Sequence, residues 1–160
     1  GQNGNLTTLT QNTRIRGNVF EVTGYPTLNS FEMYLSCSNF QVSCINPGLH
    51  FYVHTRETST NNWELVWDDI NSDPWSSGSL VSSGNIGIVL QEGYQVALSV
   101  GWENANLAYI YDAPSQTSYP TIGSLVSSIL IDNPTDLENP TLSMSTYWNY
   151  YQKLSTTRLE

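Results

Sequence analysis

Aromatic and neutral polar side chains are the groups in this sequence best suited to chemistry, and that chemistry is recognition. The chain holds 5 Trp and 10 Tyr in 160 residues. An aromatic ring stacks on the apolar face of a sugar ring, and a polar tip on the ring hydrogen-bonds sugar hydroxyls. Ser, Thr and Asn, which are abundant here, supply further neutral donors and acceptors. The combination is typical of a surface that binds a glycan.

Trp75 is the first candidate for such a surface. It lies in a turn-rich segment, residues 73–78, where no alternation of apolar and polar residues requires a buried side chain. We expect the ring to contact a ligand. The alternative is that it folds back over the edge of a sheet as a lid.

Three tyrosines are further candidates because of their position in strand patterns. Tyr109 and Tyr111 flank Ile110, and Tyr52 follows Phe51. Successive side chains of a strand point to opposite faces of the sheet. If the apolar residue of each pair points into the core, the tyrosines point outward, where they can contact a ligand.

His50 and His54 share one strand face with Tyr52 and Arg56. Four residues along a strand span about 13 Å, too far for two histidines that bind one zinc ion. The stripe is therefore either a solvent-facing strand surface or a ligand-contacting one. With His54 included, the predicted ligand-binding residues are Trp75, Tyr109, Tyr111, Tyr52 and His54.

A calcium loop is the one metal site that the spacing suggests. Asp69, Asn71 and Asp73 have the D-x-N-x-D spacing in which alternate oxygens turn toward a hard cation. Pro74 and Leu80 stand where an EF-hand has its turn glycine and its bidentate glutamate, so any site is irregular. Asp and Asn also form turns for local hydrogen-bonding reasons. A further calcium candidate, with a solvated turn as the alternative, comprises Asp132, Asp136 and Glu138.

The sequence does not predict an enzyme. A glycosidase needs two carboxyl groups facing each other across a cleft, and the candidate glutamates lie at or beside predicted strands without a motif: Glu32, Glu64, Glu92 and Glu103. A G-x-S-x-G elbow, an H-E-x-x-H motif, a Cys–His signature and a glycine-rich phosphate loop are all absent. No cofactor is required; structural calcium is the only one considered.

Charge argues against two classes of partner. The sequence has 14 acidic and 5 basic residues and a formal net charge of −9. Such a surface repels a phosphate backbone and an anionic membrane leaflet. The longest apolar runs fall far short of the roughly 20 residues that a membrane helix needs. We therefore predict neither nucleic-acid binding nor membrane insertion.

Strand patterns recur along the chain, separated by Gly, Pro, Asn and Ser. Apolar and polar residues alternate with period 2, and no convincing helical stripe occurs. The predicted strands are residues 13–22, 28–35, 49–56, 63–68, 86–90, 94–102, 107–111, 125–131 and 145–154. Many short strands predict a single antiparallel β-sandwich, jelly-roll-like, with about nine to ten strands. By the same alternation Trp63, Trp67, Tyr94 and Trp102 belong to its core.

Cys37 and Cys44 predict a disulfide and an oxidising compartment. They flank six residues, a spacing that suits a staple across a short loop between strands; two buried free thiols are the alternative. Low lysine content and neutral polar residues also favour a secreted or cell-surface protein. We expect residues 1–12 to be an extension or first edge strand, 13–157 the domain, and 158–160 a tail that includes a cloning remnant, Leu159–Glu160. No signal peptide is recognisable at the start, so we expect a mature fragment or excised domain.

Several segments resemble the β-sandwich accessory modules of large secreted bacterial proteins, which often stand beside peptidase or carbohydrate-active domains. The resemblance is one of strand texture and covers residues 13–157. It lies in FEMYL (31–35), LHFYV (49–53), WELVW (63–67), GIVLQEGY (87–94), VGW (100–102), YIYD (109–112) and YYQKLST (150–156). It implies accessory, non-catalytic work and transfers no site residue.

Two functions from different classes are therefore expected. The first is a non-catalytic module that binds a glycan or cell-surface polymer by aromatic stacking and neutral hydrogen bonds. The alternative is a structural or interaction module that spaces or docks a neighbouring domain of a larger protein without binding sugar. A glycan binder should expose aromatics on a face or in a cleft, whereas a spacer should bury nearly all its tryptophans.

Overall fold

Period-2 alternation becomes strand structure throughout the chain. The computed structural model describes residues 5–7, 10–37, 43–44, 48–112, 118–119, 121–145 and 149–158, and all regular elements there are strands. Every pairing is antiparallel. The predicted all-β, antiparallel sandwich is thus confirmed. The described residues form 15 strands rather than nine to ten, and seven of these strands have only two residues. No helix among the described residues could cross a membrane.

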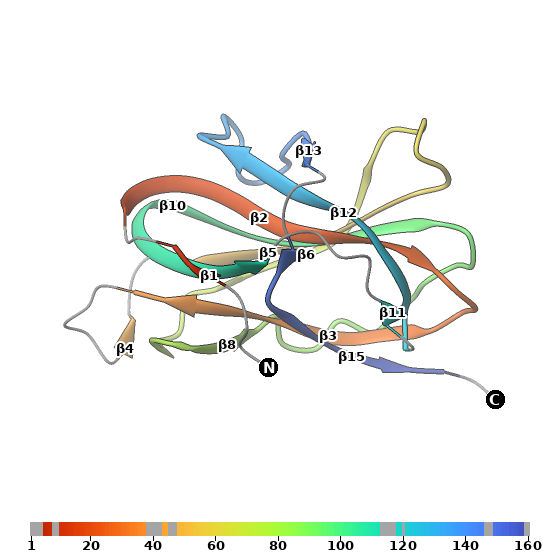
Figure 1. The fold of residues 1–160 in the computed structure, drawn as a ribbon, viewed down its shortest axis with the longest axis horizontal. Helices are drawn as coiled ribbons and strands as arrows, with labels where there is room; N and C mark the ends of the chain where they lie inside the picture. The colour runs from red at the N-terminus through yellow and green to blue at the C-terminus, as the bar shows by residue number, and fades with distance from the viewer. Residues whose placement is uncertain are drawn as a thin grey trace.

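The first layer is a sheet with the longest strand near its centre (Figure 1). In spatial order its strands are β11 (Ser118–Tyr119), β12 (Gly123–Asp132), β2 (Thr10–Val22), β10 (Gln95–Asp112), β5 (Leu49–Arg56) and β6 (Glu64–Asn71). A short strand, β13 (Met144–Ser145), returns to pair with β12.

The second layer is built around one strand, β3 (Thr27–Ser36). On one edge β3 pairs with β15 (Gln152–Thr157), and on the other with β8 (Ser79–Ser82) and β9 (Ile88–Val89). The expected N-terminal extension contributes β1 (Asn5–Leu6) and the first residues of β2, while Leu159 and Glu160 lie outside the described residues. β1 and β14 (Asn149–Tyr150) both pair with the end of β10.

The strand β10 belongs to both layers. Its first part pairs with β2 and β5, its later residues Ala108 and Tyr109 pair with β3, and its register shifts between Trp102 and Ala105. At this bulge Asn104 has φ +47°, a left-handed conformation that Asn tolerates better than most residues. A bulge bends a strand and increases its twist, so β10 curves from one layer into the other (Figure 1).

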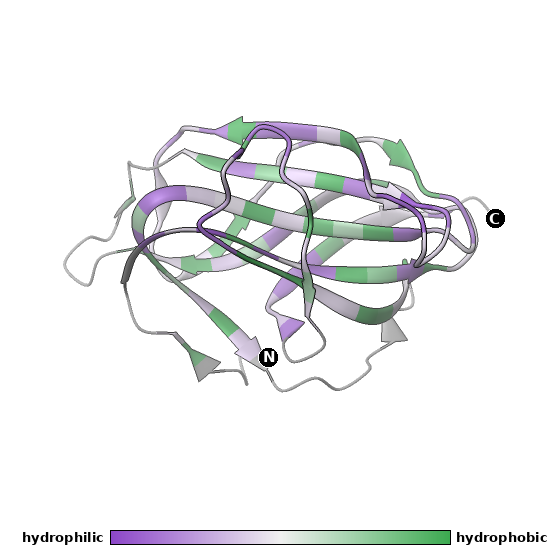
Figure 2. Cartoon of the chain, turned by 90° about the horizontal axis from the view of Figure 1, so that it is seen from above, coloured by the Kyte–Doolittle hydropathy of each residue, from purple (hydrophilic) through white to green (hydrophobic). Residues whose placement is uncertain are grey.

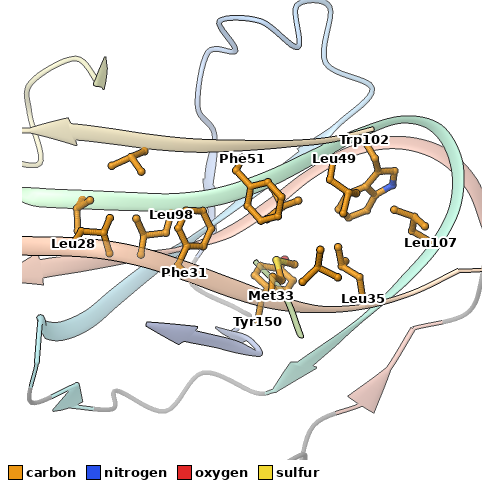
Figure 3. Close-up of a cluster of buried hydrophobic side chains, with 14 of the residues drawn as sticks. Leu28, Phe31, Met33, Leu35, Leu49, Phe51, Leu98, Trp102, Leu107 and Tyr150 are labelled. Atoms are coloured by element: carbon orange, nitrogen blue, oxygen red, sulfur yellow. The ribbon is translucent and has the colours of Figure 1, made fainter. Parts of the chain in front are cut away.

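Apolar side chains fill the space between the layers. Phe31 of β3 and Phe51 of β5 meet edge to face, with ring centroids 5.6 Å apart. Figure 3 shows part of this core, with Leu28, Phe31, Met33, Leu35, Leu49, Phe51, Leu98, Trp102, Leu107 and Tyr150. Trp102 is buried as predicted, and Trp67 packs partly buried against the same cluster.

Trp75 is buried at the disulfide, so the expectation that it forms an exposed platform is wrong. A two-stranded sheet pairs β4 (Ser43–Cys44) with β7 (Trp75–Ser76), which places Trp75 opposite Cys44. The predicted Cys37–Cys44 disulfide is present, and Trp75 is only 7% exposed in the core cluster. The ring belongs to the same buried cluster as the two cysteines instead of facing solvent. This agrees with the alternative in which Trp75 folds back over the edge of a sheet.

Reducing the disulfide should lower the free energy of unfolding by about 2–3 kcal/mol, because the bond closes a short loop in the unfolded chain. Urea unfolding with and without a reductant measures the change. The control is the double variant Cys37→Ser, Cys44→Ser, which should match the reduced protein and ignore the reductant. Equal midpoints for the oxidised and reduced wild type would contradict this expectation.

Candidate ligand-binding site

A stripe of polar and aromatic residues runs along β5 on the outer face of the first layer. His50, Tyr52, His54 and Arg56 share this face, as predicted, but they are 7%, 0%, 1% and 8% exposed. The expectation that Tyr52 and His54 face solvent and contact a ligand is therefore wrong. Residues 133–143, here called the covering loop, connect β12 to β13 and lie over this face (Figure 2).

The covering loop is held by a second apolar cluster and by Tyr52. The cluster comprises Ile15, Val19, Tyr52, Ala97, Ile129 and Ile131, with Leu137 and Leu142 of the loop packed on it. The Tyr52 hydroxyl donates a hydrogen bond to the backbone oxygen of Leu137. A Cβ at Gly101 would lie 3.1 Å from the Tyr52 ring, so the absence of a side chain there gives the ring its space. Tyr52 thus holds the covering loop.

The two histidines of the stripe differ in their surroundings. The Nε2 atom of His50 lies 2.9 Å from Oδ2 of Asp68, and its ring stacks on Tyr52 at 4.2 Å between centroids. Neither ring nitrogen of His54 has a hydrogen-bond partner among the described residues. Burial lowers the pKa of His54 to about 4, against a smaller opposing effect from Asp68. His54 is therefore a neutral, buried residue at neutral pH.

A pocket opens at the Arg56 end of the stripe. It has a volume of about 450 Å³, within the range of ligand sites. The turn between β5 and β6 forms one side, and the end of the covering loop with β13 forms the other. The pocket, here called the Arg56–Trp63 pocket, is lined by Arg56, Asn61, Asn62, Trp63, Asn139, Pro140, Thr141, Leu142 and Met144.

Arg56 and Trp63 both line this pocket and form a stacked pair. The Arg56 guanidinium lies 4.2 Å from the centroid of the Trp63 ring, within the range of a cation–π contact. Its Nε donates to Oε1 of Gln95 at 2.9 Å. Burial lowers the pKa of Arg56, but an arginine remains charged in proteins. The site therefore combines a half-buried aromatic ring, a fixed cation and side-chain amides.

A bulge explains why sequence alternation placed Trp63 in the core. Trp67 of β6 pairs with Val53, but Leu65 pairs with the very next residue of β5, His54, so Val66 is the extra residue in β6. Trp67 therefore packs on the inner cluster, whereas Leu65 and Trp63 pack on the outer one. The adjacent Asn61–Asn62 pair, which is typical of an exposed turn, was the one signal that could have indicated an accessible ring.

A second pocket of about 220 Å³ contains Tyr109. Arg14 and Arg16 both line it, and both pair with Oδ1 of Asp132, at 3.0 and 2.6 Å. Arg16 Nε also donates to the Tyr109 hydroxyl at 2.9 Å. The charged groups of this pocket thus pair with one another. We interpret the pocket as a structural polar cluster that joins β2, β10 and β12.

The five residues predicted to bind ligand do not form one surface. Tyr111 packs partly buried against the core cluster, and Tyr109 contacts Trp102, Tyr150 and Arg16. The expectation that both tyrosines point into solvent is wrong: both are only partly exposed and pack against the core cluster, because β10 changes layer at Asn104. Trp75, Tyr52 and His54 are buried elsewhere.

The predicted calcium residues lie at the end of β6 and in the turn after it. Asn71 Oδ1 accepts a hydrogen bond from the Asp73 amide at 3.0 Å, and Asp69 Oδ1 accepts one from the Ile70 amide at 2.9 Å. Asp132 pairs with arginines, and Asp136 Oδ1 accepts from the Glu138 amide. No group of three or more His, Cys, Asp or Glu side chains within the described ranges could hold a metal. Calcium binding stays a prediction.

Comparison with known proteins does not assign this chain to a family. No family model, curated protein or solved structure matches the chain. The site is therefore interpreted from its geometry alone.

Proposed function

We propose that this protein is a non-catalytic extracellular module that binds a glycan in the Arg56–Trp63 pocket. The observation that carries the proposal is a half-buried tryptophan in a pocket that is also lined by three asparagines and a threonine. An aromatic face and neutral amides are the groups that bind the two chemical faces of a sugar ring.

The size and rigidity of the pocket support this function. A volume of about 450 Å³ accommodates a short oligosaccharide rather than a long buried ligand. The Arg56 guanidinium stacks on the Trp63 ring, and the turn before Trp63 is held by the hydrogen bond from Thr58 Oγ1 to Asn61 Oδ1 at 2.6 Å. Such a site gives modest affinity by itself, which several copies in a larger protein would raise by multivalency.

The extracellular part of the proposal is supported by the disulfide and the composition. Disulfides form and persist in oxidising compartments, and Cys37–Cys44 is formed. The single lysine and the net charge of −9 fit a secreted module of a bacterial surface or multidomain protein. Neighbouring domains of that protein would be its other partners.

A structural or docking module is the second candidate. Trp102 and Trp75 are buried at 2% and 7% exposure, as a spacer domain requires. The half-buried Trp63 in an open pocket favours the glycan over the spacer. The outcome of the saccharide titration below separates the two functions.

Replacing Trp63 with alanine should weaken saccharide binding about tenfold or more, because the ring supplies the stacking face. Stacking of this kind contributes about 0.5–1.5 kcal/mol beyond the buried area, and the apolar area lost with the ring adds to this. The measurement is tryptophan fluorescence of the full wild-type chain, titrated with a panel of neutral and acidic polysaccharides, followed by calorimetry of wild type and variant with any polymer that binds. A saturable blue shift for one polymer in the wild type is the expected signal.

The matched control is Trp67→Phe, which changes the tryptophan of β6 that packs on the inner cluster. It should lower stability but leave saccharide affinity unchanged. Binding that survives Trp63→Ala would place the site elsewhere. A wild-type spectrum that no polymer moves would reject the glycan function in favour of the spacer.

A further inference from the structure

We propose that the glycan in the Arg56–Trp63 pocket carries a carboxylate, as a uronic acid does, and that the Arg56 guanidinium binds it. This inference rests on the proposed function and names its ligand class. Arg56 is only 8% exposed, yet it lines the pocket. A buried charge is costly unless a partner compensates it.

Arg56 has no such partner in the described part of the chain. The ion pairs there are all made by other side chains. Among the residues that line the pocket, Arg56 is the one cation, and none carries a carboxylate. The aromatic face of Trp63 and neutral oxygens compensate the charge only in part. A ligand carboxylate would complete the pairing inside a site that already excludes much of the water.

The geometry of the guanidinium also leaves the right donors for a carboxylate. An arginine has five N–H donors. Nε donates at 2.9 Å to Gln95, whereas the bonds from Nη1 to the Asn61 backbone oxygen and from Nη2 to Met144 Sδ are both 3.4 Å long. One further N–H remains on each Nη. A bidentate pair of N–H donors is the arrangement that fits a planar carboxylate.

The surrounding charges make this site selective rather than generally attractive to anions. The exposed Glu57 follows Arg56 and accepts a hydrogen bond from the Tyr94 hydroxyl at 3.1 Å, and Glu64 is exposed at the start of β6. With a net charge of −9, the protein repels polyanions at long range. An anion therefore gains affinity only if its sugar ring also fits Trp63 and brings its carboxylate to Arg56.

The test compares acidic sugars with uncharged counterparts of the same shape. Oligosaccharides of galacturonate, glucuronate and mannuronate, together with their carboxyl-reduced forms, are titrated into the full chain by calorimetry. We expect one acidic oligosaccharide to bind about tenfold or more tightly than its reduced form, because a charge-assisted pair is lost.

Two variants assign the preference to Arg56. Arg56→Gln should remove the preference, so that the acidic ligand and its reduced form bind this variant with equal affinity. Arg56→Lys keeps the charge without the fork and should recover part of the preference. Melting curves check that each variant is folded. Acetate, as a bare carboxylate, should not compete at equal concentration.

The outcomes separate this inference from the proposed function. Equal affinity of the acidic and reduced sugars, or a preference that Arg56→Gln preserves, would overturn the carboxylate and leave glycan binding intact. Competition by acetate at equal concentration would show simple anion binding and overturn it too. If no sugar binds, acidic or neutral, both proposals fail.

Discussion

Asn18→Ala should lower the free energy of unfolding by about 3–5 kcal/mol, far more than most polar substitutions, because it leaves buried partners without hydrogen bonds. Asn18 is 0% exposed. Its Nδ2 donates to the Tyr150 backbone oxygen at 2.9 Å and to Gln152 Oε1 at 3.0 Å, and its Oδ1 accepts from the Tyr150 amide at 3.0 Å. The amide therefore joins β2 of the first layer to the C-terminal strands.

The network continues through Gln152, whose Nε2 donates to the Leu98 backbone oxygen at 2.9 Å. Two buried side-chain amides thus tie the layers together in the interior. The matched control is Asn29→Ala: Asn29 Nδ2 donates to Thr157 Oγ1 at 2.8 Å, but the bond is exposed, so the loss should stay below about 1 kcal/mol. Urea unfolding of both variants measures the difference. Equal losses would show that the buried network adds no stability.

The fold class could be predicted from the sequence because the core is formed by strands in which apolar and polar residues alternate. Segments such as 94–102 place an apolar residue at every second position, and a strand with that pattern buries one face wherever its partners lie. The polar network could not be predicted in this way. Asn18 and Tyr150 are 132 residues apart in the chain, and nothing in the local pattern distinguishes a buried asparagine from a turn.

The candidate site was missed for two physical reasons. The alternation of His, Tyr and His along β5 predicts a solvent-facing surface. The covering loop that buries this surface lies far away in the sequence, since Tyr52 and Leu137 are 85 residues apart. The extra residue in β6 then reverses the face on which Trp63 lies. Alternation predicts faces only while the register is regular, and a single bulge moves every residue beyond it to the other face.

Acid should destabilise this protein through His54, by about 3 kcal/mol between pH 6.5 and pH 4. The folded protein keeps His54 neutral down to a pKa of about 4, whereas an unfolded chain takes up the proton near pH 6.5. Below pH 6.5 the unfolded state therefore binds more protons, and stability falls until the folded state is protonated as well. Above pH 6.5 the residue has no effect on the pH dependence.

The variant His54→Gln removes the titrating group and should flatten this part of the profile. The unfolding free energies of variant and wild type are measured with urea from pH 7 to pH 4.5. In their difference, the contribution of carboxylates that both proteins share cancels. The control is His50→Gln, which removes the other histidine of the stripe, beside Asp68. A His54→Gln profile parallel to that of the wild type would mean that the buried ring takes up its proton without opening the structure.

The groups facing His54 explain why no compensation is expected. Asp68 on β6 favours the protonated ring, but this carboxylate already lies against His50 Nε2, and the desolvation of His54 is the larger effect. Tyr52, the nearest ring at 5.9 Å, donates its hydroxyl to the covering loop. That same loop supplies Asn139 and Leu142 to the Arg56–Trp63 pocket. Protonation of His54 favours exposure of the ring to water, which requires the covering loop to move, so the pocket should become less ordered as well. Saccharide affinity should therefore fall over the same pH range in the wild type and persist in His54→Gln.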